Sequence, residues 1–403
     1  MSPNWSLKSR FQKILGIEKK AGIAAPEPWL FDLFGGAPNT SGIAITPRVA
    51  MTCAPVNCAV RVISESVGQL PVHVFKRSSD GAKSRATDHP VYRLLHDAAN
   101  EWTPAFEFRR QLTQDALLHH GGFAFINRVD GRPVELLRLQ PQAVTVKPDE
   151  VTGEPTYAIA EGNGLRPLAR QDVIHIRAPF TDGHRDEPLI RLAADSIGLC
   201  LQMERHAARL MANGARPSGL LALKGNITPD TLKNAKAAWN AQHSAANSGG
   251  TAVIPSDVSW QSMTFSSVDA EFMEMRKFAI NEIARVFRVP PSMLYALERV
   301  THSNGEQLGS EFITFTLMSW IKRWEGEVSL KLFSPDERAN YYAEFLTDDL
   351  ARADLATRVE AQVKQIAARI INPNEARAQN NMQPYAGGDR FENPNTTASG
   401  AAA

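Results

Sequence analysis

The sequence contains few cysteines, and their spacing matches no common disulfide or zinc pattern. Cys53, Cys58 and Cys200 are the three cysteines among 403 residues, and no two of them form a C-x-x-C pair. An odd number of cysteines without that spacing indicates reduced thiols and argues against both a disulfide framework and a zinc site. His119 and His120 are adjacent in the chain, so on a helix they would point to different faces and would not hold one metal ion.

Sequence signatures of the common enzyme classes are missing as well. The chain has no Gly-Lys-Ser/Thr phosphate loop, no H-E-x-x-H and no G-x-S-x-G. The glycines at 162 and 164 have no helix behind them and predict a hairpin turn rather than a nucleotide loop. We therefore expect a protein that is not an enzyme and that carries no cofactor and no metal.

Neither charge nor hydrophobicity is concentrated in the chain. Lysine and arginine number 44 against 43 aspartate and glutamate, a net charge of +1, which argues against a strongly basic coat for nucleic acid. The longest strongly apolar, uncharged run is 312–321, too short to span a bilayer as a helix. No signal-peptide pattern is visible at the N-terminus, so we expect synthesis in the cytoplasm and no membrane association.

The hydrophobic pattern predicts a mixed α+β protein of two or three compact units. Residues 1–48 show no sustained period and predict a mobile arm, whereas 50–70 repeat apolar residues as a buried helix does. Asp88 and Pro90 are expected to open a short helix, and Thr103 with Pro104 to open a longer one. Short strands separated by glycine and proline follow between 123 and 178, and a further strand is expected at 341–346.

Residues 215–265 read as a small α/β module carried between two helices. The first helix is expected over 186–214, closed by Asn213-Gly214, and the second over 267–288, stopped by Pro290-Pro291. The second helix repeats apolar residues every three or four positions, and its basic residues are balanced by acidic ones. The pattern therefore indicates a module on a pair of helical stalks.

A loop at 292–304 and a long helix at 305–333 complete this central region. Trp320, Trp324 and Val328 lie on one stripe of the helix. A last amphipathic helix is expected near 355–370, followed by an Asn372-Pro373-x-Glu375 capping box. From residue 386 onward, Gly, Asn, Thr and Ala dominate, and we expect disorder.

An ordered set of motifs in this region resembles the portal proteins of tailed double-stranded DNA phages, the type that bacterial gene transfer agents also use. The set comprises Phe287-Arg288-Val289-Pro290-Pro291, Leu297 to Asn304, Glu306-Gln307, and Trp320 to Glu325. The likeness extends from about Val49 to Tyr385. It implies a ring, normally of twelve subunits, at one vertex of the capsid, through which double-stranded DNA is packaged and ejected.

The resemblance also assigns parts to the chain. It implies a mobile N-terminal arm (1–48), a wing (49–185), two stem helices (186–214 and 266–291), a clip (215–265), a tunnel loop (292–304), a long helix with the wing return (305–346), a helical crown (347–385) and a disordered tail (386–403). Expected partners are further copies in a homo-oligomeric ring, DNA in the channel without sequence specificity, the major capsid protein, the terminase large subunit and a head–tail adaptor. The expected location is the virion, after assembly in the bacterial cytoplasm.

Carried over residue by residue, the resemblance yields three sets of candidate functional residues. Arg299 and His302 are the preferred contacts to the DNA backbone. The tunnel-loop set is Tyr295, Glu298, Arg299, His302 and Asn304; the stem set is Arg276, Lys277, Ile283 and Arg285; and the clip set, expected to dock a partner, is Lys224, Thr228, Lys233 and Trp239.

Two other classes of protein remain open from the sequence. One is a non-viral scaffold or adaptor that binds a partner through 215–265. The other is a hydrolase using Asp172 and His175, which lie three residues apart at the start of a predicted strand. Such spacings are common by accident, so we treat this pair as the weaker alternative.

Overall fold

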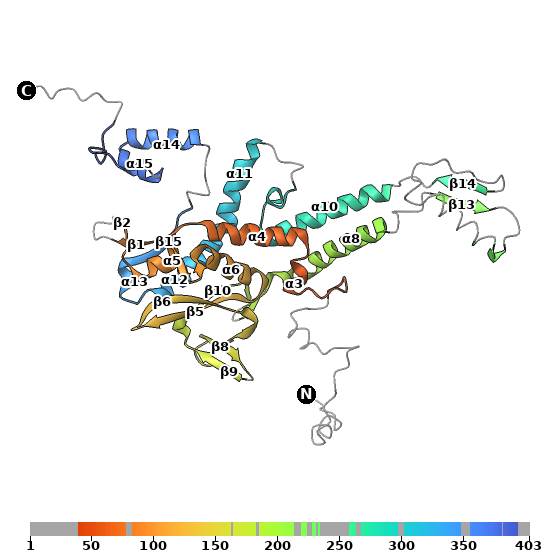
Figure 1. Ribbon diagram of the computed structural model, residues 1–403, viewed down its shortest axis with the longest axis horizontal. Helices are drawn as coiled ribbons and strands as arrows, with labels where there is room; N and C mark the ends of the chain where they lie inside the picture. Colours follow the sequence, from red (N-terminus) through yellow and green to blue (C-terminus); the bar gives the residue numbers. More distant parts are fainter. Residues whose placement is uncertain are drawn as a thin grey trace, which may run out of the picture. The chain divides into compact units, whose positions relative to one another are not determined.

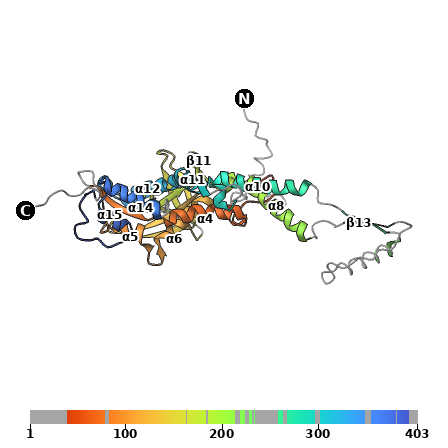
Figure 2. The same ribbon diagram turned by 90° about the horizontal axis from the view of Figure 1, so that it is seen from above.

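The computed structural model describes residues 39–77, 83–162, 164–182, 185–212, 219–223, 228–230, 233, 258–262, 267–296, 302–347, 355–380 and 382–393. The chain divides into two compact units, here called unit 1 (1–53 and 193–283) and unit 2 (54–192 and 284–403). Helices and strands are mixed throughout the chain, as predicted, and Figures 1 and 2 show them from two sides.

Two long helices and a third from the far end of the chain form the centre of unit 2. On α4 (Ala54–Gln69) the predicted apolar face, including Val56, Val60 and Ile63, is completely buried. It packs against α6 (Ala105–Leu118), whose Phe108 and Leu112 are buried in turn. The third helix is α12 (Met318–Leu332).

A three-stranded sheet joins distant parts of the chain. Its order is β15 (Tyr341–Phe345), β1 (Val72–Arg77) and β2 (Lys83–Arg85), all antiparallel, with Val74 opposite Ala343. Residues 72–75 of β1 are all buried, so both faces of this strand are covered. His73 is buried, and its Nδ1 lies 3.2 Å from the hydroxyl of Tyr92, a residue of α5 (Pro90–His96).

Two further antiparallel sheets pack together through a shared apolar cluster. One has the order β10 (Val173–Arg177), β5 (Gly121–Val129) and β6 (Arg132–Leu139); the other has β7 (Val144–Pro148), β8 (Pro155–Glu161) and β9 (Gly164–Leu168). Phe123, Val144, Tyr157, Leu168 and Val173 form the cluster. The turn at Gly162 joins β8 to β9 as a hairpin, which confirms the sequence prediction.

The long helix of the central region is helical over its whole predicted length but is not uniform. It consists of α11 (His302–Phe312), a π-helical turn (Ile313–Leu317) and α12. Trp320, Trp324 and Val328 are buried, as the stripe predicted. The Trp324 indole N–H donates to the Thr113 hydroxyl of α6 at 3.1 Å, which satisfies the one polar group of this buried side chain.

Several predicted boundaries are wrong by a few residues. The short helix α5 is capped by His89 rather than Asp88, and residues 103–104 form β4, so that α6 begins at Ala105. The helix expected over 186–214 begins late: 185–187 form the strand β12, and the helix is divided into α7 (Leu189–Leu192) and α8 (Ala194–Ala212). The long helix begins at His302, three residues earlier than expected.

Short elements connect these parts of unit 2. The predicted capping box is present on α15, where Asn372 accepts from the Glu375 N–H and the Glu375 carboxylate accepts from the Asn372 N–H. The remaining elements are β3 (Ala98–Asn100), β4 (Thr103–Pro104), η1 (Pro141–Ala143), η2 (Arg170–Asp172), β11 (Phe180–Asp182), β12 (Arg185–Glu187), η4 (Pro291–Leu294), α13 (Glu337–Asn340), α14 (Leu355–Ala367) and α15 (Pro373–Gln379).

Unit 1 contains the two stalk helices and part of the module between them. The helices are α8 and α10 (Ser267–Phe287); α8 leads toward β13 (Gly219–Leu223), which pairs with β14 (Val258–Ser262) before α10 begins. Figure 1 shows α8 and α10 running alongside each other. A pair of strands, β13 and β14, thus lies between the two helices in the chain, and a compact module over 215–265 stays a prediction.

The expected mobile arm is too long at its C-terminal end, because residues from 39 onward are bound to α8. The Asn39 side chain donates to the Ala194 carbonyl at 2.7 Å, Thr40 donates to the Asp195 carboxylate, and Gln202 donates to the Ser41 carbonyl. A Cβ on Gly198 would collide with this segment, so glycine permits the close approach. Helix α3 (Pro47–Ala50) follows directly.

Candidate functional site

Helix α10 carries the predicted stem residues, and the structure separates them into a buried and an exposed set. Ile283 is fully buried within the single subunit, whereas Arg276 and Arg285 are exposed. Lys277 pairs with Glu274 at 3.2 Å, which is the internal pairing that the balanced charges predicted. Ile283 is therefore a core residue of the subunit, and its side chain is not exposed for contact with another chain.

A different set of apolar side chains is exposed on the stalk helices. Met273, Met275 and Phe278 of α10 are more than half exposed, and Leu199 of α8 is 42% exposed. The two helices contact each other through His206 and Phe272, whose rings lie 5.6 Å apart. Large apolar side chains at these positions leave about half of their surface in contact with solvent, and an apolar surface of this kind is typical of a contact site for another chain.

The chain leaves α10 through a tight reversal. Arg288 has φ +56°, and the Val289 N–H donates to the Ala284 carbonyl at 2.9 Å, which closes the helix in the manner of a Schellman motif. The Thr316 hydroxyl, in the π-helical turn, donates to the Arg288 carbonyl. The end of α10 and the π-helical turn therefore both hold this reversal in place before Pro290 and Pro291.

The structure describes only part of the predicted tunnel loop and clip. Tyr295 follows η4 with φ +62° and is 83% exposed. His302 and Asn304 lie in the first turn of α11 rather than in a loop, and Thr228 and Lys233 are exposed. Glu298, Arg299, Lys224 and Trp239 lie outside the described residues. The grouping of these side chains into a tunnel loop and a docking surface stays a prediction.

Asp172 and His175, the pair behind the hydrolase alternative, bind different partners. The Arg128 guanidinium donates to Asp172 at 2.9 Å. His175 contacts the Tyr157 hydroxyl through Nδ1 at 3.2 Å and has Asp186 Oδ2 3.2 Å from Nε2, without hydrogen-bond alignment. A catalytic dyad of Asp172 and His175 is therefore not formed.

A buried polar cluster surrounds His175 instead. Its backbone N–H donates to Glu327 at 3.0 Å, and Arg177 donates to both oxygens of Asp186 at 3.1 Å. Burial raises the pKa of Tyr157 and of Glu327. The cluster joins β8, β10, β12 and α12. Tyr157 and Glu327 could not be recognised from the sequence as members of this cluster, because they come from other segments of the chain.

The adjacent histidines behave as two separate groups. His119 ends α6 and lies 3.3 Å from the Gln142 amide nitrogen, whereas the His120 ring packs on Phe123. Burial lowers the pKa of His119 to about 4. Within the part of the chain that the structure describes, no group of three His, Cys, Asp or Glu side chains could hold a metal ion.

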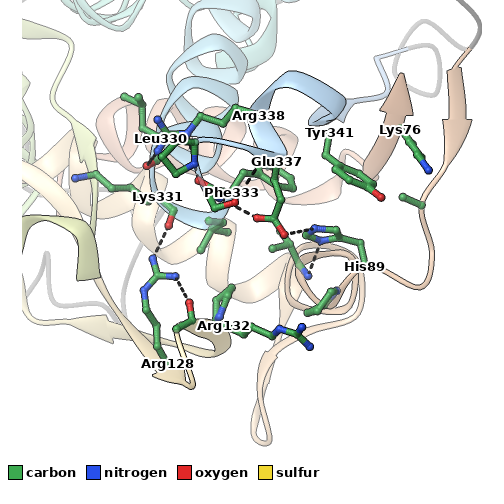
Figure 3. A pocket seen from close by; sticks show the side chains of 18 of the residues that line it. Lys76, His89, Arg128, Arg132, Leu330, Lys331, Phe333, Glu337, Arg338 and Tyr341 are labelled. Carbon is green, nitrogen blue, oxygen red and sulfur yellow. Dashed lines mark hydrogen bonds and ion pairs between the residues drawn. The ribbon is translucent and has the colours of Figure 1, made fainter. Parts of the chain in front are cut away.

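A pocket of about 940 Å³ lies at the C-terminal end of α12 (Figure 3). Arg338 donates to the Leu330 and Phe333 carbonyls, and Arg128 donates to the Lys331 carbonyl. His89 faces Glu337 at 3.5 Å. Cations bound to the last carbonyls of a helix are explained by capping and by the helix dipole. The basic character of this pocket is therefore structural in origin.

No helix within the described ranges is both long and apolar enough to cross a membrane.

Two of the known proteins similar to this chain are described as portal proteins. The chain is 27% identical over 387 residues to the probable portal protein of Streptomyces phage phiC31, with 93% of this chain and 83% of that protein covered. It is 27% identical over 339 residues to the portal protein of Enterobacteria phage HK97, with 82% and 78% covered. Both names describe the relatives themselves.

Solved structures show the same fold. A chain from the virion of a native gene transfer agent particle superposes with a TM-score of 0.59 at 20% identity, covering 94% of this chain and all of that one. An HK97 family phage portal protein from Corynebacterium diphtheriae gives a TM-score of 0.52 at 16% identity, with 79% and 98% covered. The family model named phage portal protein matches residues 54–381, and the chain therefore belongs to the phage portal protein family.

Proposed function

We propose that this chain is the repeating subunit of a ring at one capsid vertex, and that double-stranded DNA enters and leaves the particle through the ring's axis. The observation that carries the proposal is the pair of stalk helices, because Met273, Met275 and Phe278 are exposed on α10 in a single subunit. Side chains of this kind call for a partner chain, and a closed ring provides one for every subunit. A structural relative described as the neck of a gene transfer agent particle has C12 symmetry, which supports a ring of twelve.

The ring acts passively in this proposal. The chain contains no Gly-Lys-Ser/Thr phosphate loop, so the ATPase that moves the DNA belongs to another protein, the terminase large subunit. The module at 215–265 is the proposed docking surface for the terminase during packaging and for the head–tail adaptor afterwards. The major capsid protein surrounds the ring, which is assembled in the bacterial cytoplasm and remains in the virion.

The division of labour along the chain follows the family architecture. We assign the wing to 49–185, the stem to α8 and α10, the tunnel loop to 292–304 and the crown to 347–385. The charges of α10 fit a channel wall: within 266–288 the four basic residues are matched by four acidic ones. A balanced wall lets a phosphate backbone slide past, because each neutralised phosphate would add affinity and hold the DNA.

Native mass spectrometry and negative-stain imaging of the purified protein test the ring. A closed ring of about twelve copies with an open axis is the expected result. A particle of one or two copies without a central hole, also in the presence of its capsid protein, would contradict the proposal and favour a scaffold that binds a partner through 215–265.

Deletion of 294–303 tests the tunnel loop separately. Rings should form normally, but the amount of DNA packaged or retained per particle should fall, because the loop is the proposed contact to the DNA backbone. Replacement of Arg299 and His302 by alanine, with Arg166 on β9 replaced as a control, narrows the effect to these side chains. Normal DNA content in the deletion variant would contradict the role of the loop.

A further inference from the structure

A rigid, exposed tryptophan lies at the tip of the hairpin formed by β3 and β4. Trp102 is 71% exposed, although tryptophan is among the residues that gain most from burial. The hairpin holds it firmly: the Asn100 side chain is buried, accepts from the Trp102 N–H at 3.1 Å and donates to the Leu136 carbonyl at 2.8 Å. A tryptophan presented on a pre-ordered turn loses little conformational entropy on binding.

The tip is also acidic. Glu101, beside the tryptophan, is exposed, and Asp97, just before β3, has a side chain that is 59% exposed. The tip therefore combines one large aromatic ring with carboxylates. A matching receptor would be a pocket with apolar walls and cationic groups.

A pocket of this kind, of about 480 Å³, lies on the outer face of α12. Its lining contains one carboxylate, Glu327, and five cations, Arg170, Arg177, Lys322, Arg323 and Lys331. Arg170, Arg177 and Lys322 already pair with carboxylates of the same subunit, so Arg323 and Lys331 supply the charge that a partner would meet. Val146, Pro148, Pro155 and Leu330 supply apolar wall. Pockets of this size hold drug-sized ligands, so an indole ring fits.

Two details show that the pocket is open to an occupant. Arg323 makes no ion pair within the described residues; it donates to the Pro179 carbonyl at 3.4 Å and lies over the Trp320 ring. Gly326 lies on the same wall, and a Cβ there would meet nothing within 4 Å. A glycine inside a helix costs about 0.5–1 kcal/mol relative to alanine. Packing within the subunit does not require a glycine at this position. A close approach by another chain would require one, because a side chain here would stand in its way.

The tip and the pocket lie on different sides of unit 2. β3 and β4 contact α5, α6 and β6, whereas the pocket is lined by α12, β10 and the strands β7 and β8. Two complementary surfaces on opposite sides of one subunit are what a head-to-tail ring requires.

We propose that the Trp102 tip of one subunit inserts into the α12 pocket of the next subunit around the ring. Trp102 then packs against the apolar wall and Arg323, while Glu101 lies near Lys322. This inference rests on the proposed ring, and it names a wing contact in addition to the stem contact. A tip that instead binds the capsid protein is a separate outcome of the experiment below.

Site-specific cross-linking tests the contact in assembled rings. A Glu101→Cys/Lys322→Cys variant is treated with a short bismaleimide and analysed by denaturing electrophoresis. A ladder of covalent oligomers is expected, whereas the single variants and a matched Glu360→Cys/Lys322→Cys control should remain monomeric. Wild-type protein measures any background from the three native cysteines. Rings that form without a ladder would overturn this inference and leave the proposed function standing; wild-type protein that forms no ring would count against both.

A second measurement examines the energetics. Trp102→Ala should raise the protein concentration at which half of the subunits are in rings by at least tenfold, with the melting temperature of the subunit unchanged. Leu165→Ala, which removes another exposed apolar side chain of unit 2, is the matched control and should change nothing. Equal assembly of both variants would contradict the inference. A Trp102→Ala variant that assembles normally but no longer binds purified capsid protein would assign the tip to that partner.

Discussion

Arg109 is a buried cation that is held by backbone carbonyls rather than by a carboxylate. It is 4% exposed, and its guanidinium donates to the carbonyls of Gly68, Leu70 and Leu95. Two of these carbonyls follow or end α4, and the third lies in the last turn of α5, where carbonyls lack helical partners. Burial lowers the pKa of Arg109 to about 10, so the group stays charged at neutral pH.

Replacement of Arg109 by methionine should therefore destabilise the subunit strongly. Three buried carbonyls would lose their donor, and one unsatisfied buried polar group already costs about 1–3 kcal/mol. We expect the free energy of unfolding, measured by urea denaturation, to fall by at least about 2–3 kcal/mol. Arg110→Met, at a neighbouring partly buried position of α6 where the side chain pairs with Glu107 instead of with carbonyls, is the control. A loss of less than 1 kcal/mol for Arg109→Met would mean that water replaces the guanidinium.

His119 predicts a pH dependence of stability. Burial lowers its pKa to about 4 in the folded protein, so between about pH 4 and 6.5 the unfolded chain binds the proton and the folded chain does not. The folded state therefore loses stability as the pH falls through this window. His119→Gln should flatten the decrease in melting temperature between pH 6.5 and 4. Identical profiles for the variant and the wild type would contradict the assignment.

At the scale of elements, two helices end on an arginine in the left-handed region. Arg288 after α10 has φ +56°, and Arg369 after α14 has φ +60°. Both ends show the same bond, from Val289 to Ala284 and from Ile370 to Gln365. Glycine is the usual residue at this position because a Cβ is strained there.

Arg288→Gly should consequently be tolerated or stabilising, despite the loss of a charged side chain. Relief of the left-handed strain offers up to about 1 kcal/mol, although the freer unfolded chain offsets part of it. Arg288→Val should destabilise, since a β-branched residue suits this conformation worst. Thermal unfolding of the two variants distinguishes them, and a glycine variant that is less stable than the valine variant would contradict the backbone argument.

The stalk helix α10 predicts different outcomes for its two apolar sets. Phe278→Glu places a charge on an exposed position and should block ring assembly while the subunit stays folded. Ile283→Asp places a charge in a fully buried position and should unfold the subunit itself, because an isolated buried charge is costly. Circular dichroism and native mass spectrometry separate the two effects. Normal rings from Phe278→Glu would exclude this face of α10 from the interface.

At the scale of the whole molecule, one sheet of unit 2 pairs a strand from early in the chain with a strand from late in the chain. Strand β1 pairs with β15, and the Phe345 N–H donates to Glu325 of α12 at 3.1 Å. Leu346 adds a bond to the Pro71 carbonyl. The sheet is thus incomplete until the chain has been made as far as residue 346.

Truncation tests this closure. A chain ending at residue 340 lacks β15, which leaves β1 with an unpaired edge and uncovered apolar residues, and it should aggregate or remain sensitive to protease. A chain ending at residue 347 retains β15 and should keep unit 2 folded, as limited proteolysis and circular dichroism can establish. Equal protease resistance of the two truncations would show that the closing strand is dispensable.

Local patterns were sufficient for most elements of this protein. The apolar repeat of α4, the tryptophan stripe of α12 and the capping box of α15 are all properties of neighbouring residues, and each is present in the structure. The ordered motifs from Phe287 to Glu325 were sufficient for the family, because they depend on residue types in sequence order. The boundaries at His302 and Leu189 were missed, because backbone contacts beyond the local pattern decide where a helix begins.

Only the tertiary structure decided which side chains share a site. Asp172 and His175 are near neighbours in sequence, yet Arg128 and Asp186 bind them separately, because alternate residues of this region face different neighbours. Ile283 and Phe278 belong to one helical pattern, yet one is buried and the other exposed. Periodicity states that a face is apolar. The packing of segments distant in the chain determines whether that face is covered by the same subunit or left for the next one.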